Sequence, residues 1–167
     1  MENAYINELI STLEHVEIRS NINRTDECKN YDDGIRTLVD TFTRHKESQT
    51  QLFFIGNGGS SAIASHMTTD FMKNGGMNTY SLYDNAVTTC MGNDYGYEHI
   101  FSRPMEFLVK EGDLVVAISS SGNSCNIINA IVLLKGSMQE KGNWLMMRFI
   151  WKESCAAKLE AGRIRLL

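Results

Sequence analysis

One stretch, Phe53–Asp70, constrains the fold more than any other part of this 167-residue sequence. It continues an apolar run, Leu52–Ile55, which predicts a buried strand, and then enters the glycine-rich turn Gly56–Ser60. Residues with helical spacing follow at once. A strand that enters such a turn and then a helix presents backbone N–H groups at the positive end of a helix dipole. The pattern therefore predicts an anion site, most commonly for phosphate, in an α/β fold.

A second strand–loop–helix unit lies about sixty residues further along the chain. The apolar run Leu114–Ile118 leads into Ser119–Ser124, where residues with helical spacing begin again. Taken alone, a glycine-rich stretch is most often a tight turn, and a serine-rich stretch is most often a solvated connection. Here both follow buried strands, and ligands of open α/β sheets bind at the carboxyl ends of strands. Two such loops predict a site for a phosphorylated, polyhydroxylated ligand.

The order of the elements predicts one α/β domain built on a parallel sheet. Strands that alternate with helices give parallel strands joined by right-handed crossovers. The predicted elements are strands at 51–55, 79–82 and 114–118 and helical segments at 60–73, 86–91, 100–109 and from 124 onwards.

Two amphipathic helices are predicted before the first strand. Apolar residues at helical spacing mark one helix over residues 3–20 and another over residues 32–45, and the polar stretch 21–30 between them reads as a loop. Such a pair serves either a subunit interface or core packing.

Composition and charge exclude several classes of function. A net charge of −4 argues against a nucleic-acid partner, because neutralising phosphate backbones takes a surplus of Lys and Arg. No apolar run approaches the length of a membrane span, and the N-terminus does not resemble a signal peptide. Four scattered cysteines, Cys28, Cys90, Cys125 and Cys155, fit reduced thiols of a cytoplasmic protein. Cys125 is either a nucleophile beside the serine loop or, as its place at a helix start favours, a small filler.

Two further groups of polar residues are candidates for chemistry. His66 and Asp70 stand four residues apart on the predicted helix, so they share one face. They suit a divalent metal or a base with its neighbour, although an isolated pair of this kind is more often a solvated surface pair. Asn93 and Asp94 lie in the predicted polar turn 92–97 and suit sugar hydroxyls, or form an ordinary Asx turn.

Four motifs in this order resemble the phosphoheptose isomerases, a family of sugar-isomerase (SIS) domain proteins. They are GNGGS, the helix with His66 and Asp70, GNDYGYE followed by Phe101-Ser102-Arg103, and GDLVVAISSSGNS. The resemblance runs from about residue 1 to about residue 130. It implies a flavodoxin-like three-layer sandwich, a cytoplasmic homotetramer with active sites between subunits, and the conversion of sedoheptulose 7-phosphate to D-glycero-D-manno-heptose 7-phosphate. That reaction leads to the heptose of bacterial lipopolysaccharide and capsule.

The resemblance also implies roles for individual residues. Proton abstraction beside a carbonyl, through an enediol, calls for a positioned base and electrostatic stabilisation. His66 and Asp70 would bind zinc and act in catalysis, with Asp70 as the base. The phosphate would bind to Ser119, Ser120, Ser121 and Ser124, and the sugar to Asn57, Gly58, Gly59, Ser60, Asn93 and Asp94.

Two departures separate this chain from the pattern that it resembles. The family usually has Glu at the position of Asp70, and the shorter side chain withdraws the carboxylate by about one bond. After Ala130 the family continues through further strands to a helix that carries Gln and His at the zinc site, but residues 131–167 match none of this. No Gln or His follows Gln139. Reading the permitted codons of Lys135–Asn143 one nucleotide forward allows the family-like KEACRKKVI, which suggests a frameshifted tail.

The sequence thus divides into N-terminal helices (1–48), a family-like α/β core (49–130) and a divergent tail (131–167). Three interpretations remain open. The chain is a working isomerase, a non-catalytic phosphosugar-binding SIS module, or an inactive frameshifted relative whose buried strands lack neighbours.

Overall fold

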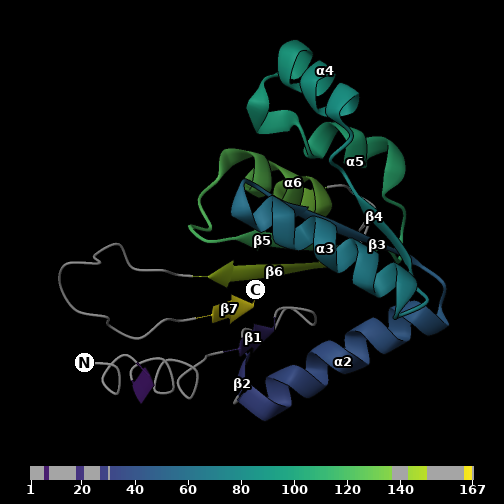
Figure 1. Cartoon of the computed structure of the whole chain (residues 1–167), viewed down its shortest axis with the longest axis vertical. Coiled ribbons are helices and arrows are strands. Elements are labelled where there is room, and N and C mark those ends of the chain that lie inside the picture. Colours follow the sequence, from purple (N-terminus) through teal and green to yellow (C-terminus); the bar gives the residue numbers. More distant parts are fainter. Residues whose placement is uncertain are drawn as a thin grey trace.

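The chain folds as an α/β sandwich of three layers, a central sheet with helices on both faces (Figure 1). The computed structural model describes residues 6–7, 18–20, 27–29, 31–136, 143–149 and 164–166. The strands of the sheet are β3 (Gln51–Gly56), β4 (Asn78–Ser81), β5 (Leu114–Ser119), β6 (Asn143–Phe149) and β7 (Ile164–Leu166). Their order is β4-β3-β5-β6-β7, with the first four parallel and β7 antiparallel to β6. The predicted α/β fold with a parallel sheet is confirmed.

The helices follow the predicted order in the core of the chain. The helices predicted at 60–73 and from 124 onwards are present as α3 (Gly59–Lys73) and α6 (Cys125–Gly136), each after the loop that follows a central strand. Within the described residues, none of the helices is long and apolar enough to span a membrane. The helices are α2 (Tyr31–Glu47), α3 (Gly59–Lys73), α4 (Asn85–Tyr95), α5 (Ser102–Leu108) and α6 (Cys125–Gly136), with a 3-10 turn, η1 (Tyr97–His99).

The two central strands, β3 and β5, are buried on both faces. Because successive strand residues point to opposite faces, Phe53 and Ile55 pack toward α5 and α6, while Leu52 and Phe54 pack toward α2 and α3. All four are at most 1% exposed. Burial on both faces explains why β3 is an unbroken apolar run in the sequence, as parallel strands between helices commonly are.

Helix α2 takes part in core packing. The rings of Phe42 on α2 and Phe71 on α3 lie 4.7 Å apart, and Phe71 also packs on Phe54 of β3 at 5.4 Å. Two roles were predicted for the N-terminal helices, a subunit interface or core packing. For the second of these helices, α2, the structure shows core packing. Its outer face carries exposed apolar side chains, Ile35 and Val39.

The predicted first helix and the loop after it need correction. Ile6 and Asn7 are helical, but Ile18–Ser20 form a strand, β1, which pairs antiparallel with β2 (Glu27–Lys29) inside the predicted loop. Strand pairing between distant residues, here Ile18 with Lys29, outweighs the local helical periodicity. The rest of the predicted helix, residues 3–5 and 8–17, lies outside the described residues.

The divergent tail contributes to the sheet. β6 lies parallel to β5 with Leu114 opposite Asn143, and β7 pairs with β6. The expectation that the tail leaves a buried strand without a neighbour is therefore wrong, because β6 occupies the position beside β5. A frameshift of the tail stays a prediction, and an intact reading frame in the resequenced coding DNA would refute it.

A buried carboxylate ties the starts of β3 and β5 together. Asp113 is 4% exposed, and its Oδ1 accepts a hydrogen bond from the backbone N–H of Gln51 at 2.8 Å. Its Oδ2 accepts one from the backbone N–H of Lys110, also at 2.8 Å. Hydrogen bonds to an ionised acceptor are stronger than neutral ones, so Asp113 fixes the end of the sheet opposite the two predicted loops.

Stability should depend on pH through His45, which is 7% exposed with its Nδ1 2.7 Å from the Thr50 hydroxyl. Burial, and secondly the positive charge of Arg44, lower the pKa of His45 below its usual 6.5. The native state therefore holds a neutral imidazole that the unfolded chain protonates as the pH falls below about 6.5. We expect the free energy of unfolding in urea to fall between pH 7 and pH 5. His45→Gln should flatten this decline, and an unchanged slope in that variant would contradict the assignment.

Candidate functional site

The two predicted loops meet where the direction of chain crossover reverses. β3 and β5 are neighbours, but α3 carries the chain from β3 to β4 on one side, and α6 carries it from β5 to β6 on the other. The two helices therefore lie on opposite faces of the sheet (Figure 1). At such a point the helix N-termini diverge and leave a crevice, which is where open α/β sheets bind ligands.

The glycine loop (residues 56–60) depends on close backbone packing. Gly58 has a φ of +53°, a conformation that favours glycine, and it precedes α3 with no side-chain cap. A Cβ on Gly56 would stand 2.8 Å from the backbone of Ser60 and 2.9 Å from the carbonyl oxygen of Ile118. The hydroxyl of Tyr83 donates to the Gly56 carbonyl at 3.0 Å, and burial raises the pKa of Tyr83 to about 12, so this donor keeps its proton. β5 and the glycine loop thus pack without room for a side chain.

The serine loop (residues 119–124) uses two of its hydroxyls to hold its own backbone. Ser119 is 4% exposed, and its Oγ accepts from the Gly122 N–H at 3.0 Å. The Ser121 Oγ accepts from the Asn123 N–H at 3.1 Å. Ser120 and Ser121 are exposed, whereas Ser124 lies at the start of α6. The loop therefore directs Ser124 toward the crevice and leaves Ser120 and Ser121 open to solvent.

A reciprocal pair of amides joins the two loops. Asn57 Nδ2 donates to Asn126 Oδ1 at 2.8 Å, and Asn126 Nδ2 donates to Asn57 Oδ1 at 2.9 Å. The Tyr97 hydroxyl also donates to Asn57 Oδ1, at 3.2 Å. Asn126 is only 2% exposed. This amide pair holds the glycine loop against the start of α6.

A pocket of about 700 Å³ opens beside the amide pair. Of the predicted site residues, Asn57 and Ser124 line it, and they come from the two loops. The turn η1 closes one side, because Asn129 Nδ2 on α6 donates to the Glu98 carbonyl at 3.0 Å. The residues that line the pocket are Asn57, Tyr97, Glu98, Ser124, Cys125, Asn126 and Asn129. The structure thus brings the two loops together as the sequence predicts.

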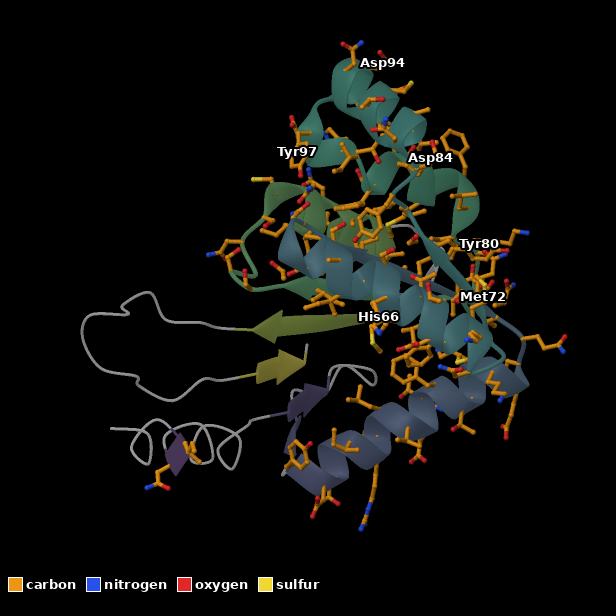
Figure 2. The ribbon with its side chains drawn as sticks, in the orientation of Figure 1. His66, Met72, Tyr80, Asp84, Asp94 and Tyr97 are labelled. Atoms are coloured by element: carbon orange, nitrogen blue, oxygen red, sulfur yellow. The ribbon has the colours of Figure 1, made fainter. Side chains whose placement is uncertain are left out.

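The turn predicted at 92–97 is wrong, and its two site residues lie elsewhere. Asp84 caps α4 by accepting from the Val87 N–H at 2.9 Å, and the helix runs on to Tyr95 before Gly96, with a φ of +86°, ends it. Asn93 and Asp94 therefore stand in the last helical turn, bonded to each other at 2.9 Å. Figure 2 shows Asp94 at the outer tip of α4 and Tyr97 above α3. Tyr97 lines the pocket, whereas neither Asn93 nor Asp94 does.

The pair His66 and Asp70 forms, but it stands apart from this pocket. His66 Nε2 lies 3.2 Å from Asp70 Oδ2, and the side chains are 75% and 44% exposed. Figure 2 shows His66 on the lower side of α3 and Tyr97 on the upper side. Neither residue of the pair lines the pocket beside the amide pair. Within one chain, the structure confirms the shared helix face but does not bring this pair to the two loops.

Zinc needs three or four protein ligands, and the described part of the chain does not supply them. Among those residues, no group of three or more His, Cys, Asp or Glu side chains gathers where it could hold a metal ion. His66 and Asp70 provide two donors with hydrogen-bonding geometry between them. The described residues alone therefore do not fit a zinc site.

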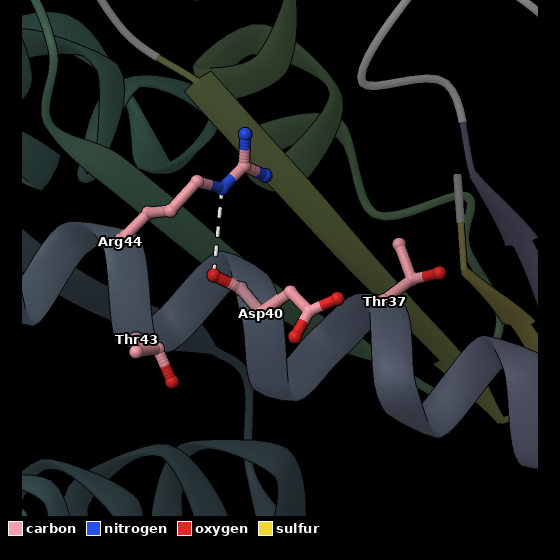
Figure 3. Close-up of a pocket in the computed structure, with 4 residues that line it drawn as sticks. All are labelled: Thr37, Asp40, Thr43 and Arg44. Carbon is pink, nitrogen blue, oxygen red and sulfur yellow. Dashed lines mark hydrogen bonds between the residues drawn. The ribbon is translucent and has the colours of Figure 1, made fainter.

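A second hollow, of about 510 Å³, lies along α2 (Figure 3). It is lined by Thr37, Asp40, Thr43 and Arg44, and Arg44 Nε donates to the Asp40 carbonyl at 3.4 Å. All four described lining residues come from one helix. Among its described lining residues, this hollow therefore lacks the convergence of separate elements seen at the first pocket.

The sequence did not single out several residues that line the pocket. Tyr97 was part of the predicted turn 92–97 and Glu98 followed it, whereas Asn126 and Asn129 were part of a predicted helix. The one available signal was the polar Asn126 two positions after Ser124, inside an otherwise apolar helix start. Cys125 lines the pocket as an exposed free thiol at the start of α6.

Comparison with known proteins gives relatives that are named phosphoheptose isomerases. The chain is 36% identical over 134 residues to a phosphoheptose isomerase of Aneurinibacillus thermoaerophilus, covering 75% of this chain and 66% of the relative. It is 34% identical over 119 residues to that of Fusobacterium nucleatum, covering 68% and 59%. It spans about half to two thirds of the length of the curated relatives that it matches.

Solved structures share the fold. A phosphoheptose isomerase from Francisella tularensis superposes with a TM-score of 0.72 at 21% identity, covering 99% of this chain and 83% of that one. The enzyme from Neisseria gonorrhoeae gives 0.62 at 24% identity, covering 98% and 82%. The sequence profile of the SIS domain matches residues 5–136, which include both loops and the pocket. The chain therefore belongs to the SIS domain family.

Proposed function

We propose that this chain is a phosphosugar isomerase that converts sedoheptulose 7-phosphate to D-glycero-D-manno-heptose 7-phosphate. The observation that carries the proposal is the pocket at the crossover reversal, where Asn57 and Ser124 come together from two loops. Relatives that bear the name phosphoheptose isomerase support the choice of substrate. A role in the heptose of surface polysaccharides and a cytoplasmic location belong to the same proposal.

The serine loop would hold the phosphate. Ser124 lines the pocket, and α6 begins at the next residue, Cys125. Ser120 and Ser121 are exposed in the same loop. The positive end of the α6 dipole and the hydroxyl donors both favour a phosphate group there. Ser119 would act indirectly, because it is only 4% exposed and its hydroxyl holds the backbone of the loop at Gly122.

Asp70 would be the base. Isomerisation removes a proton from the carbon beside the carbonyl and returns it to the neighbouring carbon, while the hydroxyl proton moves between the two oxygens. A carboxylate takes up and returns that proton, and His66, at 3.2 Å, would orient it. Because this pair stands outside the pocket of its own chain, the proposal includes a homo-oligomer, by resemblance a tetramer, in which subunits complete each other's sites. Zinc stays a prediction of the resemblance, and no step here depends on it.

The test is direct conversion by the purified chain. We expect incubation with sedoheptulose 7-phosphate, with and without added zinc, to produce anomeric proton signals of the aldose in NMR spectra. Unphosphorylated sedoheptulose serves as the control and should neither bind nor react, because the phosphate anchors the ligand. Saturation transfer to sedoheptulose 7-phosphate without conversion would refute catalysis and favour the non-catalytic phosphosugar-binding module. If neither saturation transfer nor conversion is observed, the proposed site itself is refuted.

A further inference from the structure

The amide pair has a fixed orientation, and one backbone group determines it. The N–H of Ile127 donates to Asn126 Oδ1 at 2.9 Å, and an N–H can only donate, so this atom of Asn126 must be the oxygen. Asn126 Nδ2 then faces Asn57 and donates to its Oδ1. The start of α6 thus determines which way both amides point.

This orientation limits what Asn57 offers to a ligand. Its Oδ1 has two acceptor sites, and both are used, by Asn126 Nδ2 at 2.9 Å and by the Tyr97 hydroxyl at 3.2 Å. Its Nδ2 carries two hydrogens, of which the amide pair uses one. Among the described residues, no further partner of the Asn57 amide occurs. Asn57 therefore presents a hydrogen-bond donor, and no acceptor, to the pocket that it lines.

Burial makes this arrangement rigid. Asn126 is 2% exposed, and a buried amide costs free energy unless its groups are paired. Turning either amide over would place oxygen against oxygen and nitrogen against nitrogen. The donor on Asn57 is therefore already oriented before a ligand enters the pocket, which is the condition for stabilising charge that develops during a reaction.

We propose that Asn126 is a positioning residue that makes Asn57 a donor-only group, aimed at the sugar oxygen that gains negative charge as the enediolate forms. The inference rests on the proposed isomerase function. In the ketose that oxygen is the carbonyl oxygen, an acceptor, so a donor suits it both before and during proton abstraction. An acceptor on Asn57 would repel it.

Asn126→Asp isolates the orienting hydrogen bond. The introduced carboxylate has the same shape and still accepts from the Ile127 N–H, but it no longer donates to Asn57 Oδ1. In either orientation, the oxygen of the Asn57 amide then faces a carboxylate oxygen. Residue 126 therefore no longer favours one orientation of Asn57 over the other. We expect kcat at pH 8 to fall about tenfold with KM nearly unchanged, because a transition-state donor is misplaced.

The pH profile separates positioning from packing. Burial raises the pKa of an introduced carboxyl group, and once protonated it donates a hydrogen bond where the Asn126 amide does. The ratio of kcat for Asn126→Asp to kcat for the wild type should therefore rise as the pH falls from 8 to 5. A variant that has only lost packing has no reason to recover on acidification. Thermal melts by circular dichroism across the same pH range monitor folding.

A second variant keeps the inference testable if Asn126→Asp fails to fold. Asn57→Asp removes the donor itself on a half-buried side chain and should lower kcat about 100-fold, again with recovery toward acid pH. The inference would be overturned if the kcat ratio for Asn126→Asp does not change with pH, or if Asn57→Asp keeps the wild-type kcat. Either result would leave the proposed isomerase function intact. The wild-type chain is the control. If it does not convert sedoheptulose 7-phosphate, the proposed function and this inference are refuted together.

Discussion

Gly56→Ala should lower the free energy of unfolding by about 2–3 kcal/mol, as overpacking a well-packed interior does. The added Cβ would meet the carbonyl carbon and oxygen of Ser60 at 2.8 Å and the Ile118 oxygen at 2.9 Å. These are backbone atoms of α3 and β5, so no side chain can rotate away, and β3 must separate from one of them. Urea unfolding followed by circular dichroism measures the change, and saturation transfer to sedoheptulose 7-phosphate should weaken in the same variant.

Gly59→Ala is the matched control three residues away. A Cβ there meets no other atom within 4 Å, and Gly59 is the first residue of α3, where Ala suits a helix better than Gly. We expect its free energy of unfolding to equal or slightly exceed that of the wild type. Equal stability of the two variants would show that close packing at Gly56 is not what shapes the glycine loop.

Asp70→Asn should reduce kcat by about 10²–10⁴-fold, the usual contribution of a general base. The amide has nearly the same size and can still bond to His66 but cannot accept a proton from carbon. The side chain is 44% exposed, so the thermal melting temperature should stay close to that of the wild type. The NMR assay for conversion, run with matched melts, measures both quantities.

Asp70→Glu is the informative companion, because related isomerases are expected to carry Glu at this position. It keeps a carboxylate and extends it by about one bond, so activity should persist or rise while the melt is unchanged. Full activity in Asp70→Asn would exclude this carboxylate as the base. Loss of activity in both variants, with normal melts, would show that the site needs both a carboxylate and the shorter side chain of Asp70.

The core of the fold could be predicted because its signals are local. β3 and β5 are apolar runs that end in glycine or serine loops, and α3 and α6 begin where these loops end. Buried parallel strands require that composition. The meeting of the two loops was likewise predictable, because the carboxyl ends of neighbouring parallel strands share one edge of the sheet.

Other elements depend on contacts that no local pattern reveals. β1 and β2 have three residues each and form by pairing with each other. The helical periodicity of residues 3–20 therefore led to a wrong prediction for β1. β6 joins the sheet through β5, although the tail that contains it has no family pattern. α4 runs through Asn93 and Asp94 because Asp84 caps its start, which made a polar sequence helical.

Within the candidate site, the sequence identified the two loops better than the residues that hydrogen-bond to them. Asn57 and Ser124 lie in motifs, but Asn126 matters through burial and through a bond to a residue 69 positions away, which sequence alone does not show. Tyr97 reaches Asn57 across 40 positions by way of η1. The roles of Ser120, His66 and Asp70 stay predictions until the assays above are done.

The two loops that form the pocket are far apart in the sequence, and this distance determines when they can meet during synthesis. Asp113 reaches back 62 positions to Gln51, and Asn126 reaches back 69 to Asn57, so β3 and the glycine loop leave the ribosome long before their partners exist. Contacts at such range must first overcome the entropy of closing a long loop. A ribosome-bound chain arrested before β5 emerges would therefore leave β3 without this neighbour in the sheet, and the pocket would assemble only once α6 has emerged.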